Sequence, residues 1–268
     1  MAKPALALSS EPGPDRIVYE QPLSERVRAF LRLEYLFGRA EYLLEDTHPL
    51  ASRGTLETVI DVMAVISRGD MRKELIKEFE RQATTMEKLA GNPNVDDTKL
   101  RTVLEPVREM LATLRISDVV PGRSLLSDEL ISAVRQRSSI PAGTCDFDLP
   151  AYHFWLQSPP DSRLQDLREW LAEFAVLRDS VSLYLQLVRE SASVSQEVAV
   201  GGFFQRTMEG NSQCQLIRVM LPHHASFYPE ISGGRHRFTV RFMYPPSGGS
   251  RAAQTEEDVE FNLLCCMM

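Results

Sequence analysis

The sequence predicts an α+β protein, with an α-helical region first and an antiparallel β region after it. Through the first two thirds of the chain, apolar residues recur at the helical spacing of three and four. Beyond Ser191 they alternate with polar residues, and clusters of Gly, Pro, Asn and Ser separate the alternating runs. We therefore expect a leader at 1–15, a strand at 16–22, a helical domain at 23–192 and a β domain at 193–268.

The beginning of the chain is expected to hold a disordered leader and one short strand. Residues 1–15 are rich in Ala, Pro and Ser and show no apolar period. The next segment, RIVYEQPL, places Ile17 and Tyr19 on one face and then meets Pro22, where a strand should end. We expect this strand to join the sheet of the β domain.

Four long amphipathic helices are expected in residues 24–114. Their apolar positions, spaced as on one helical face, are Leu33, Leu36, Phe37, Ala40 and Leu44; Leu56, Val59, Ile60 and Met63; Leu75, Ile76, Phe79, Ala83 and Met86; and Leu100, Val103, Leu104, Val107, Leu111 and Leu114. Asp70 is an expected N-cap, as is Asp96 or Asp97, because a carboxylate can accept hydrogen bonds from the free N–H groups of a helix start. These helices predict a bundle.

Further helices are expected between the bundle and the strands. Ser127 should cap a short helix that ends before Pro141. Asp148 and Pro150 should open another in LPAYHFWL, where Trp155 is expected in the core, like Trp170 further on. The run RLQDLREWLAEFAVLRDSVSLYLQLVRES predicts either a helical hairpin or one interrupted helix.

The strands of the β domain are expected in EVAVGGFFQ, QLIRVML, RFTVRFMY and DVEFNLLCC. Gly201 and Gly202 indicate a tight turn into a strand. In RFTVRFMY, side chains alternate between faces, so one face carries Phe238, Val240, Phe242 and Tyr244 and the other carries Arg237, Thr239 and Arg241. Two arginines therefore point the same way.

Bulk composition argues against several classes of protein. The formal charge of −7, from 30 basic and 37 acidic residues, is unlike that of a nucleic-acid binder, which carries a positive excess. No stretch approaches the roughly 18 apolar residues that a membrane span needs. The 4 cysteines form no C-x-x-C pairs, which indicates a reducing, cytoplasmic location rather than a disulfide framework.

Sequence motifs for catalysis, cofactors and metals are missing. The chain has no G-x-x-x-x-G-K-[ST], no G-x-G-x-x-G after a strand, no G-x-S-x-G and no H-E-x-x-H, so we expect no enzyme activity and no cofactor. His223 and His224 lack further ligands at metal spacing, so no metal is expected. The ending from Cys265 to Met268 matches the prenylation pattern C-a-a-X, but alternating Val259 and Phe261 favour a buried final strand.

Arginine placement is the feature that points to a function. Arg28, Arg32 and Arg39 lie within about 40° of one another on the first expected helix, at 100° per residue. The other candidates are Arg68 at the end of the second helix, Arg135 and Arg137 on the short helix, and Arg237 with Arg241 on the strand. Guanidinium groups suit carboxylates, so a cleft that gathers several would hold an acidic peptide. Solvated arginines, or arginines paired with nearby glutamates, are the alternative.

The sequence resembles the ZapD family of cell division proteins in several blocks, in the family's order. The blocks are YEQPLSERVRAFLRLEYLF, SRGDMRKELIKEFERQ, LISAVRQRSSIPAGTCDFDLPAYHFWL, YPEISGGRHRFTVRFM and the ending VEFNLLCC. The resemblance implies a helical part and a β part, a homodimer, and binding to the flexible C-terminal tail of FtsZ. It further implies that the dimer cross-links and bundles FtsZ protofilaments in the Z-ring at midcell.

The same resemblance implies a basic tail-binding surface. The matching positions are Arg32, Arg68, His153, Arg237 and Arg241. Relatives can carry a further basic residue where this chain has Glu129, so that edge of the surface is expected to differ. The hypothesis requires basic side chains of the helical and β regions to come together. The alternatives are an adaptor that uses this surface for another acidic protein, or a nucleic-acid binder that contacts phosphates with it.

Overall fold

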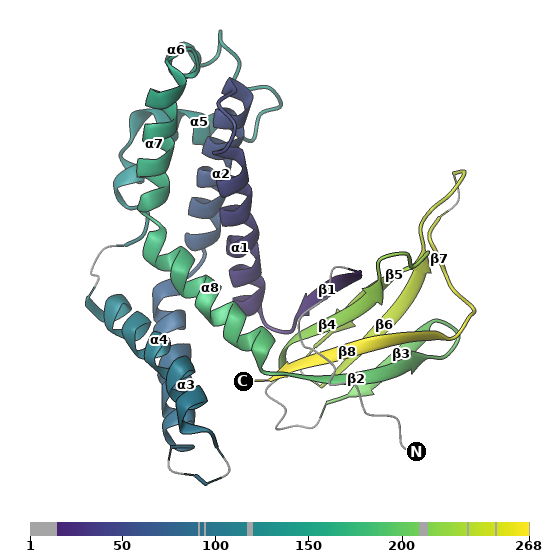
Figure 1. Ribbon diagram of the computed structural model, residues 1–268. Helices are drawn as coiled ribbons and strands as arrows, with labels where there is room; N and C mark the ends of the chain where they lie inside the picture. The colour runs from purple at the N-terminus through teal and green to yellow at the C-terminus, as the bar shows by residue number, and fades with distance from the viewer. Residues whose placement is uncertain are drawn as a thin grey trace, which may run out of the picture. The chain divides into compact units, whose positions relative to one another are not determined.

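The chain folds as an α+β protein, as predicted. The computed structural model describes residues 15–90, 92–93, 95–116, 120–208, 214–234, 236–249 and 251–267. The leader expected at 1–15 lies outside the described residues except for Asp15. Two compact units are present: Met1–Arg28 with Leu185–Met268, here called the sheet unit, and Ala29–Tyr184, here called the helical unit (Figure 1).

The helices are α1 (Glu25–Leu43), α2 (Pro49–Ile66), α3 (Met71–Glu87), α4 (Asp97–Ile116), α5 (Glu129–Arg137), α6 (Pro150–Leu156), α7 (Pro160–Ala172) and α8 (Ala175–Glu190), with a 3-10 turn η1 (Ser124–Leu126). The unit boundaries, after Arg28 and before Leu185, fall inside α1 and α8. Only Glu173 and Phe174 separate α7 from α8, and α8 runs onward instead of folding back (Figure 1). The interrupted-helix alternative is therefore the correct one.

The core of the helical unit is built from the predicted apolar stripes. Leu33, Leu56, Leu75, Phe79, Val107 and Leu114 are among the side chains that are almost wholly buried. Aromatic rings tie different helices together: the rings of Phe30 and Tyr184 lie 5.1 Å apart, edge to face, and Phe79 lies 6.5 Å from Tyr184. Such pairs add about 1 kcal/mol each to the burial of their apolar surface.

Helix starts follow the expected capping chemistry at two places. The Asp70 carboxylate accepts a hydrogen bond from the backbone N–H of Lys73 at 3.0 Å. This bond is the largest cause that lowers the pKa of Asp70. At α4 the cap is Asp96 rather than Asp97, since its carboxylate accepts from the N–H of Thr98 at 2.9 Å.

The expected cap at Ser127 is wrong. Asp128, not Ser127, caps α5, because the Asp128 carboxylate accepts from the N–H of Ile131 at 2.9 Å while the Ser127 hydroxyl donates to the carbonyl of Ser124. Helix α6 begins at Pro150, as expected, but it has no side-chain cap, and Asp148 forms an ion pair with Arg137.

The two tryptophans are half-buried rather than in the core, contrary to expectation. Their rings stand 5.6 Å apart, and the Trp155 Nε1–H donates to an oxygen of Asp166 at 2.8 Å. A buried indole needs a hydrogen-bond partner for its N–H, which favours a position near a surface carboxylate.

The sheet unit contains β1 (Arg16–Pro22), β2 (Ala192–Ala199), β3 (Phe203–Thr207), β4 (Cys214–Pro222), β5 (Tyr228–Gly233), β6 (Arg237–Tyr244), β7 (Ala253–Gln254) and β8 (Val259–Met267). They form sheet A, in the order β1-β4-β8-β2, and sheet B, in the order β3-β6-β5 with β7 beside β6. All pairings are antiparallel, and Arg16 lies opposite Pro222 in the β1–β4 pair. The predicted N-terminal strand therefore joins the sheet.

Strands β5 and β7 were not expected from the sequence. Pro229 and Gly233 interrupt the alternation of β5, which is tolerated because β5 is an edge strand of sheet B. The expected turn at Gly201 and Gly202 is confirmed, with φ values of 55° and 71°. A Cβ on Gly202 would lie 2.4 Å from the Thr255 carbonyl oxygen, so this position requires glycine.

The inner faces of sheets A and B pack on each other and form the core of the sheet unit. Its buried members are Ala199, Ile217, Val219, Leu221, Phe238, Val240, Phe242, Val259, Phe261 and Leu263. The last strand is thus a core strand, as expected, and Cys266 is fully buried on its other face. In the described part of the chain, none of the helices has the length and apolar character that crossing a bilayer requires.

Candidate functional site

Strand β6 presents two arginines on the outer face of sheet B. The burial of its residues alternates, with Phe238, Val240 and Phe242 buried and Arg237 and Arg241 exposed. Thr239 lies between the two arginines on the same face. The prediction that one face of this strand is apolar and the other carries both arginines is therefore confirmed.

The neighbouring strands place other groups beside Arg241. Phe203 of β3 lies directly opposite it on one side, and Glu230 of β5 lies opposite on the other. Residues that face each other in an antiparallel pair have their side chains on the same side of the sheet. Phe203 is 39% exposed, so an apolar ring accompanies the guanidinium group on this face.

A shallow hollow of about 650 Å³ covers this outer face. It is lined by Phe203, Gln205, Ser232, Gly233, Gly234, His236, Arg237, Phe238, Thr239 and Arg241. We call this surface the open face. Most of its side chains are hydrogen-bond donors or acceptors, and two glycines leave part of its floor as bare backbone. An extended peptide could meet both side-chain and main-chain groups there.

The arginines of the open face have no acid partner within the part of the chain that the structure describes. Among the described residues, neither Arg237 nor Arg241 forms an ion pair or a side-chain hydrogen bond, although Glu230 lies opposite Arg241 in the register. Both guanidinium groups therefore remain available for an external carboxylate. Charge-assisted hydrogen bonds of this kind contribute roughly 1.5 to 3 kcal/mol.

The candidate basic residues on or beside the helices fall into two groups. Arg32 on α1, Arg68 just after α2, Arg135 on α5 and His153 on α6 are exposed. In the part of the chain that the structure describes, their side chains form no ion pair and no hydrogen bond. These four side chains can accept an outside partner.

The other candidate arginines, Arg28, Arg39 and Arg137, are held by carboxylates. Their partners are Glu25 at 3.1 Å, Glu57 and Asp61 at 4.0 and 3.6 Å, and Asp148 at 2.6 Å, in the same order. An arginine that already holds a carboxylate must give up that contact to bind another, so these three are weaker candidates.

Sequence reasoning missed several members of the open face. Gln205, Ser232 and His236 were not singled out, because Ser232 belongs to the unexpected strand β5 and the pairing of β3 with β6 has no local signature. The dipeptide Gly233-Gly234 beside an alternating strand was the available signal for a nearby edge strand.

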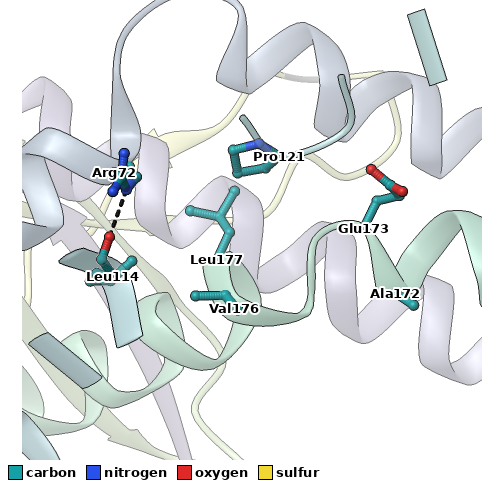
Figure 2. Close-up of a pocket in the computed structure, with 7 residues that line it drawn as sticks. All are labelled: Arg72, Leu114, Pro121, Ala172, Glu173, Val176 and Leu177. Atoms are coloured by element: carbon teal, nitrogen blue, oxygen red, sulfur yellow. Dashed lines mark hydrogen bonds between the residues drawn. The ribbon is translucent and has the colours of Figure 1, made fainter. Parts of the chain in front are cut away.

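A second hollow lies in the helical unit and has a different character. It measures about 280 Å³ and is lined by Arg72, Leu114, Pro121, Ala172, Glu173, Val176 and Leu177. Figure 2 shows the Arg72 guanidinium turned toward the Leu114 carbonyl, to which its Nε donates at 2.7 Å. Arg72 thereby supplies a hydrogen-bond donor to a carbonyl group near the end of α4. Most of the other residues that line this hollow are apolar.

Comparison with known proteins identifies the class. Residues 31–241 match a family model described as a cell division protein. The chain is 38% identical to the cell division protein ZapD of Methylococcus capsulatus, over 95% of this chain and 99% of that protein. It is 38% identical to the protein of the same name from Chromobacterium violaceum and 35% identical to that from Coxiella burnetii, over 93% of this chain in both cases.

The fold and these similarities therefore define a protein of cell division. The chain belongs to the ZapD family. Its relatives are named as cell division proteins and not as enzymes. Among the residues that the structure describes, no three His, Cys, Asp or Glu side chains gather as they would around a metal ion.

Proposed function

We propose that this protein binds the acidic, flexible C-terminal tail of FtsZ and, as a dimer, cross-links FtsZ protofilaments in the Z-ring at midcell, without catalysing a reaction. Membership of the ZapD family supports a role in division. The single observation that supports the binding site is the pair of arginines on the open face, which are exposed and pair with no carboxylate of the described residues.

The open face fits an extended acidic peptide better than a compact ligand. It is broad and shallow, and it combines two fixed positive charges with the exposed ring of Phe203. Planar guanidinium groups bind carboxylates in a defined geometry, and an aromatic ring can cover an apolar residue of the peptide. We propose Arg237 and Arg241 as the principal tail contacts, with Arg32, Arg68 and His153 as further contacts.

A single tail contact is expected to be weak, with a dissociation constant of roughly micromolar, because a disordered tail loses conformational entropy when it binds. Many tails project from one filament, so a dimer with two tail sites gains from the high local concentration of the second tail. Cross-linking of filaments then follows from two weak sites and needs no tight one.

Charge reversal on the open face tests the site. Arg241→Glu should weaken binding of an FtsZ tail peptide by about tenfold or more, because it removes a charge-assisted bond and adds repulsion. Fluorescence anisotropy with labelled peptide measures this directly. Arg101→Glu is the matched control, since Arg101 is also exposed and makes no described ion pair.

Equal affinity of the two variants would place the tail elsewhere, provided that circular dichroism shows both to be folded.

Binding should also weaken between roughly 50 and 300 mM salt, because exposed charges are screened over about 10 Å at 0.1 M. FtsZ without its tail should not co-sediment in bundles with the protein. Unchanged bundling of tail-less FtsZ would contradict the proposal.

A further inference from the structure

One end of the β4–β8 strand pair carries three cysteines. Cys214 is the first residue of β4, and Cys265 and Cys266 lie near the end of β8. Ile217 lies opposite Cys265, and the register shifts between Cys214 and Leu216. Because neighbouring residues of a strand point to opposite faces, Cys265 and Cys266 lie in different environments.

The thiols of Cys214 and Cys265 meet on the core side of sheet A. Both side chains pack against the core that the two sheets share, and both remain partly exposed. Cys214 lies opposite Met267, so Cys265, two residues before Met267 on β8, is its diagonal neighbour on the same face; the Cys214 Sγ–H donates to the Leu216 carbonyl oxygen at 3.6 Å. Two cysteines that are 51 positions apart in the sequence (265 − 214) thus lie beside each other on one face.

A charged pair from the neighbouring strands stands beside these thiols. Arg206 of β3 donates to the Glu197 carboxylate of β2 at 2.5 Å, and its guanidinium group lies over the ring of Phe204. The positive charge of Arg206 also acts on Cys265 and lowers the pKa of its thiol. The contacts with Glu197 and Phe204 hold the guanidinium group in place, and its positive charge favours an anionic sulfur at Cys265.

The three thiols of this end differ in acidity. The neighbouring Cys214 thiol, followed by the charge of Arg206, lowers the pKa of Cys265 to about 7, against the opposing effects of burial and Glu197. The neighbouring Cys265 sulfur and burial raise the pKa of Cys214, so Cys214 keeps its proton. Burial raises the pKa of Cys266 to about 12. At neutral pH, Cys265 is the sulfur nucleophile.

We propose that Cys214 and Cys265 form a hydroperoxide-sensitive dithiol that closes into a reversible disulfide between β4 and β8. The juxtaposed thiols supply both sulfurs, Arg206 stabilises the attacking thiolate, and Cys266 takes no part. The site is separate from the open face and does not depend on the proposed binding of FtsZ.

The chemistry proceeds in two steps that balance. The Cys265 thiolate attacks one oxygen of the hydroperoxide, the O–O bond breaks, and Cys265 becomes a sulfenic acid while hydroxide or alkoxide leaves. The Cys214 sulfur then attacks the Cys265 sulfur, the S–O bond breaks, and the hydroxyl leaves as water with the Cys214 proton. The two sulfurs lose two electrons and the peroxide gains them. A dithiol reductant reverses the change by thiol–disulfide exchange.

The irregular register beside Cys214 helps this closure. A disulfide requires Cα atoms about 4.4 to 6.8 Å apart, closer than the diagonal neighbours of a regular antiparallel pair. Regular pairing of β4 with β8 holds from Leu216 to Met220. Cys214 lies outside that regular stretch, so it can move toward Cys265 without breaking the pairing of the rest of β4.

Peptide mapping of the full chain tests the proposal. After treatment with a small excess of hydrogen peroxide and blocking of free thiols, a non-reducing digest should contain a peptide that links Cys214 to Cys265. Cys266→Ser should retain this linked peptide. Cys214→Ser should lose it and accumulate a sulfenic acid on Cys265 that dimedone traps.

Alkylation rates provide an independent readout of the same pair. Iodoacetamide should modify Cys265 at least about tenfold faster than Cys266 at pH 7, with a half-maximal rate near pH 7. Arg206→Gln should move that midpoint upward. A link between Cys265 and Cys266, a link between two molecules, or no loss of free thiols with peroxide would overturn the proposal.

Discussion

Strand β4 of sheet A and strand β6 of sheet B hold their arginines in opposite ways. In sheet A, residues Leu216 to Leu221 of β4 are all buried, and Arg218 within this run forms an ion pair with Glu20 at 2.9 Å. In sheet B, β6 alternates between buried and exposed residues, and Arg241 on its exposed side forms no ion pair with any described carboxylate.

The difference teaches how burial decides the role of a charge. A buried guanidinium group loses its hydration and must be compensated by a carboxylate, or the sheet would not be stable. Glu20 provides this compensation twice, since it also accepts two hydrogen bonds from Arg189 at 2.9 Å. An exposed guanidinium group keeps its water and can exchange it for the carboxylate of a partner. The exposed arginines of the open face can therefore stay charged in water without an ion pair inside the protein.

The two faces of β6 allow the strongest test of this comparison. Phe242→Ala should lower the free energy of unfolding by about 3 to 5 kcal/mol, because the ring is wholly buried between the sheets. Arg241→Ala, one residue earlier, should change it by less than about 0.5 kcal/mol. Urea unfolding followed by circular dichroism measures both. Similar losses for the two variants would mean that Arg241 is a structural residue.

The next largest effect on the free energy of unfolding is expected when one carboxylate is removed from sheet A, with removal of one from sheet B as its control. Glu20→Ala should cost about 3 kcal/mol, because it removes the carboxylate that forms an ion pair with Arg218, whose side chain is only 8% exposed. Glu230→Ala is the control in sheet B, where the carboxylate lies opposite Arg241 but forms no described ion pair. Its cost should be close to zero in the same unfolding experiment. A large loss from Glu230→Ala would show that Arg241 depends on an internal partner after all.

The smallest effect is expected where the two sheets are joined by an ion pair. Burial alone would raise the pKa of Glu197, but hydrogen bonds from Ser195 and Arg206 outweigh it and lower that pKa below its ordinary value of 4.5. The stabilisation is therefore complete above about pH 4.5 and is lost as the pH falls through the lowered pKa. Glu197→Gln should cost about 1 kcal/mol at pH 7 and less at pH 3, in thermal unfolding at both pH values. A cost that does not change with pH would contradict the lowered pKa.

The sequence predicted the elements whose signal is local. The helical stripes of α1 to α4 and the alternation of β6 identify their buried faces, because periodicity depends only on neighbouring residues. Competition between nearby caps was harder to predict. Ser127 and Asp128 are both good caps, and the Ser127 hydroxyl is already engaged with the Ser124 carbonyl. Strand β5 was missed because Pro229 hides its alternation, and only its pairing with β6 makes it a strand.

The arginine candidates show the same limit of local information. Spacing identified Arg28, Arg32 and Arg39 as one stripe, but Arg39 binds Glu57 and Asp61 of the next helix, and spacing within α1 does not reveal that contact. Arg237 and Arg241 were recognised correctly as sharing a face, since alternation along one strand decides it. Whether an arginine is free depends on tertiary neighbours, and these follow only from the fold.

The place of β1 in sheet A imposes an order on folding during synthesis. β1, at residues 16–22, pairs with β4, at residues 214–222, so it has no sheet partner until almost 200 further residues have left the ribosome. The helical unit, by contrast, lies in one continuous stretch of chain, so all of it has been synthesised before β4 begins. β1 waits longer for its partner than the other described strands do, with its backbone unpaired. Unpaired strand edges of this kind are prone to aggregation, so β1 is the strand that gains most from shielding by chaperones during synthesis.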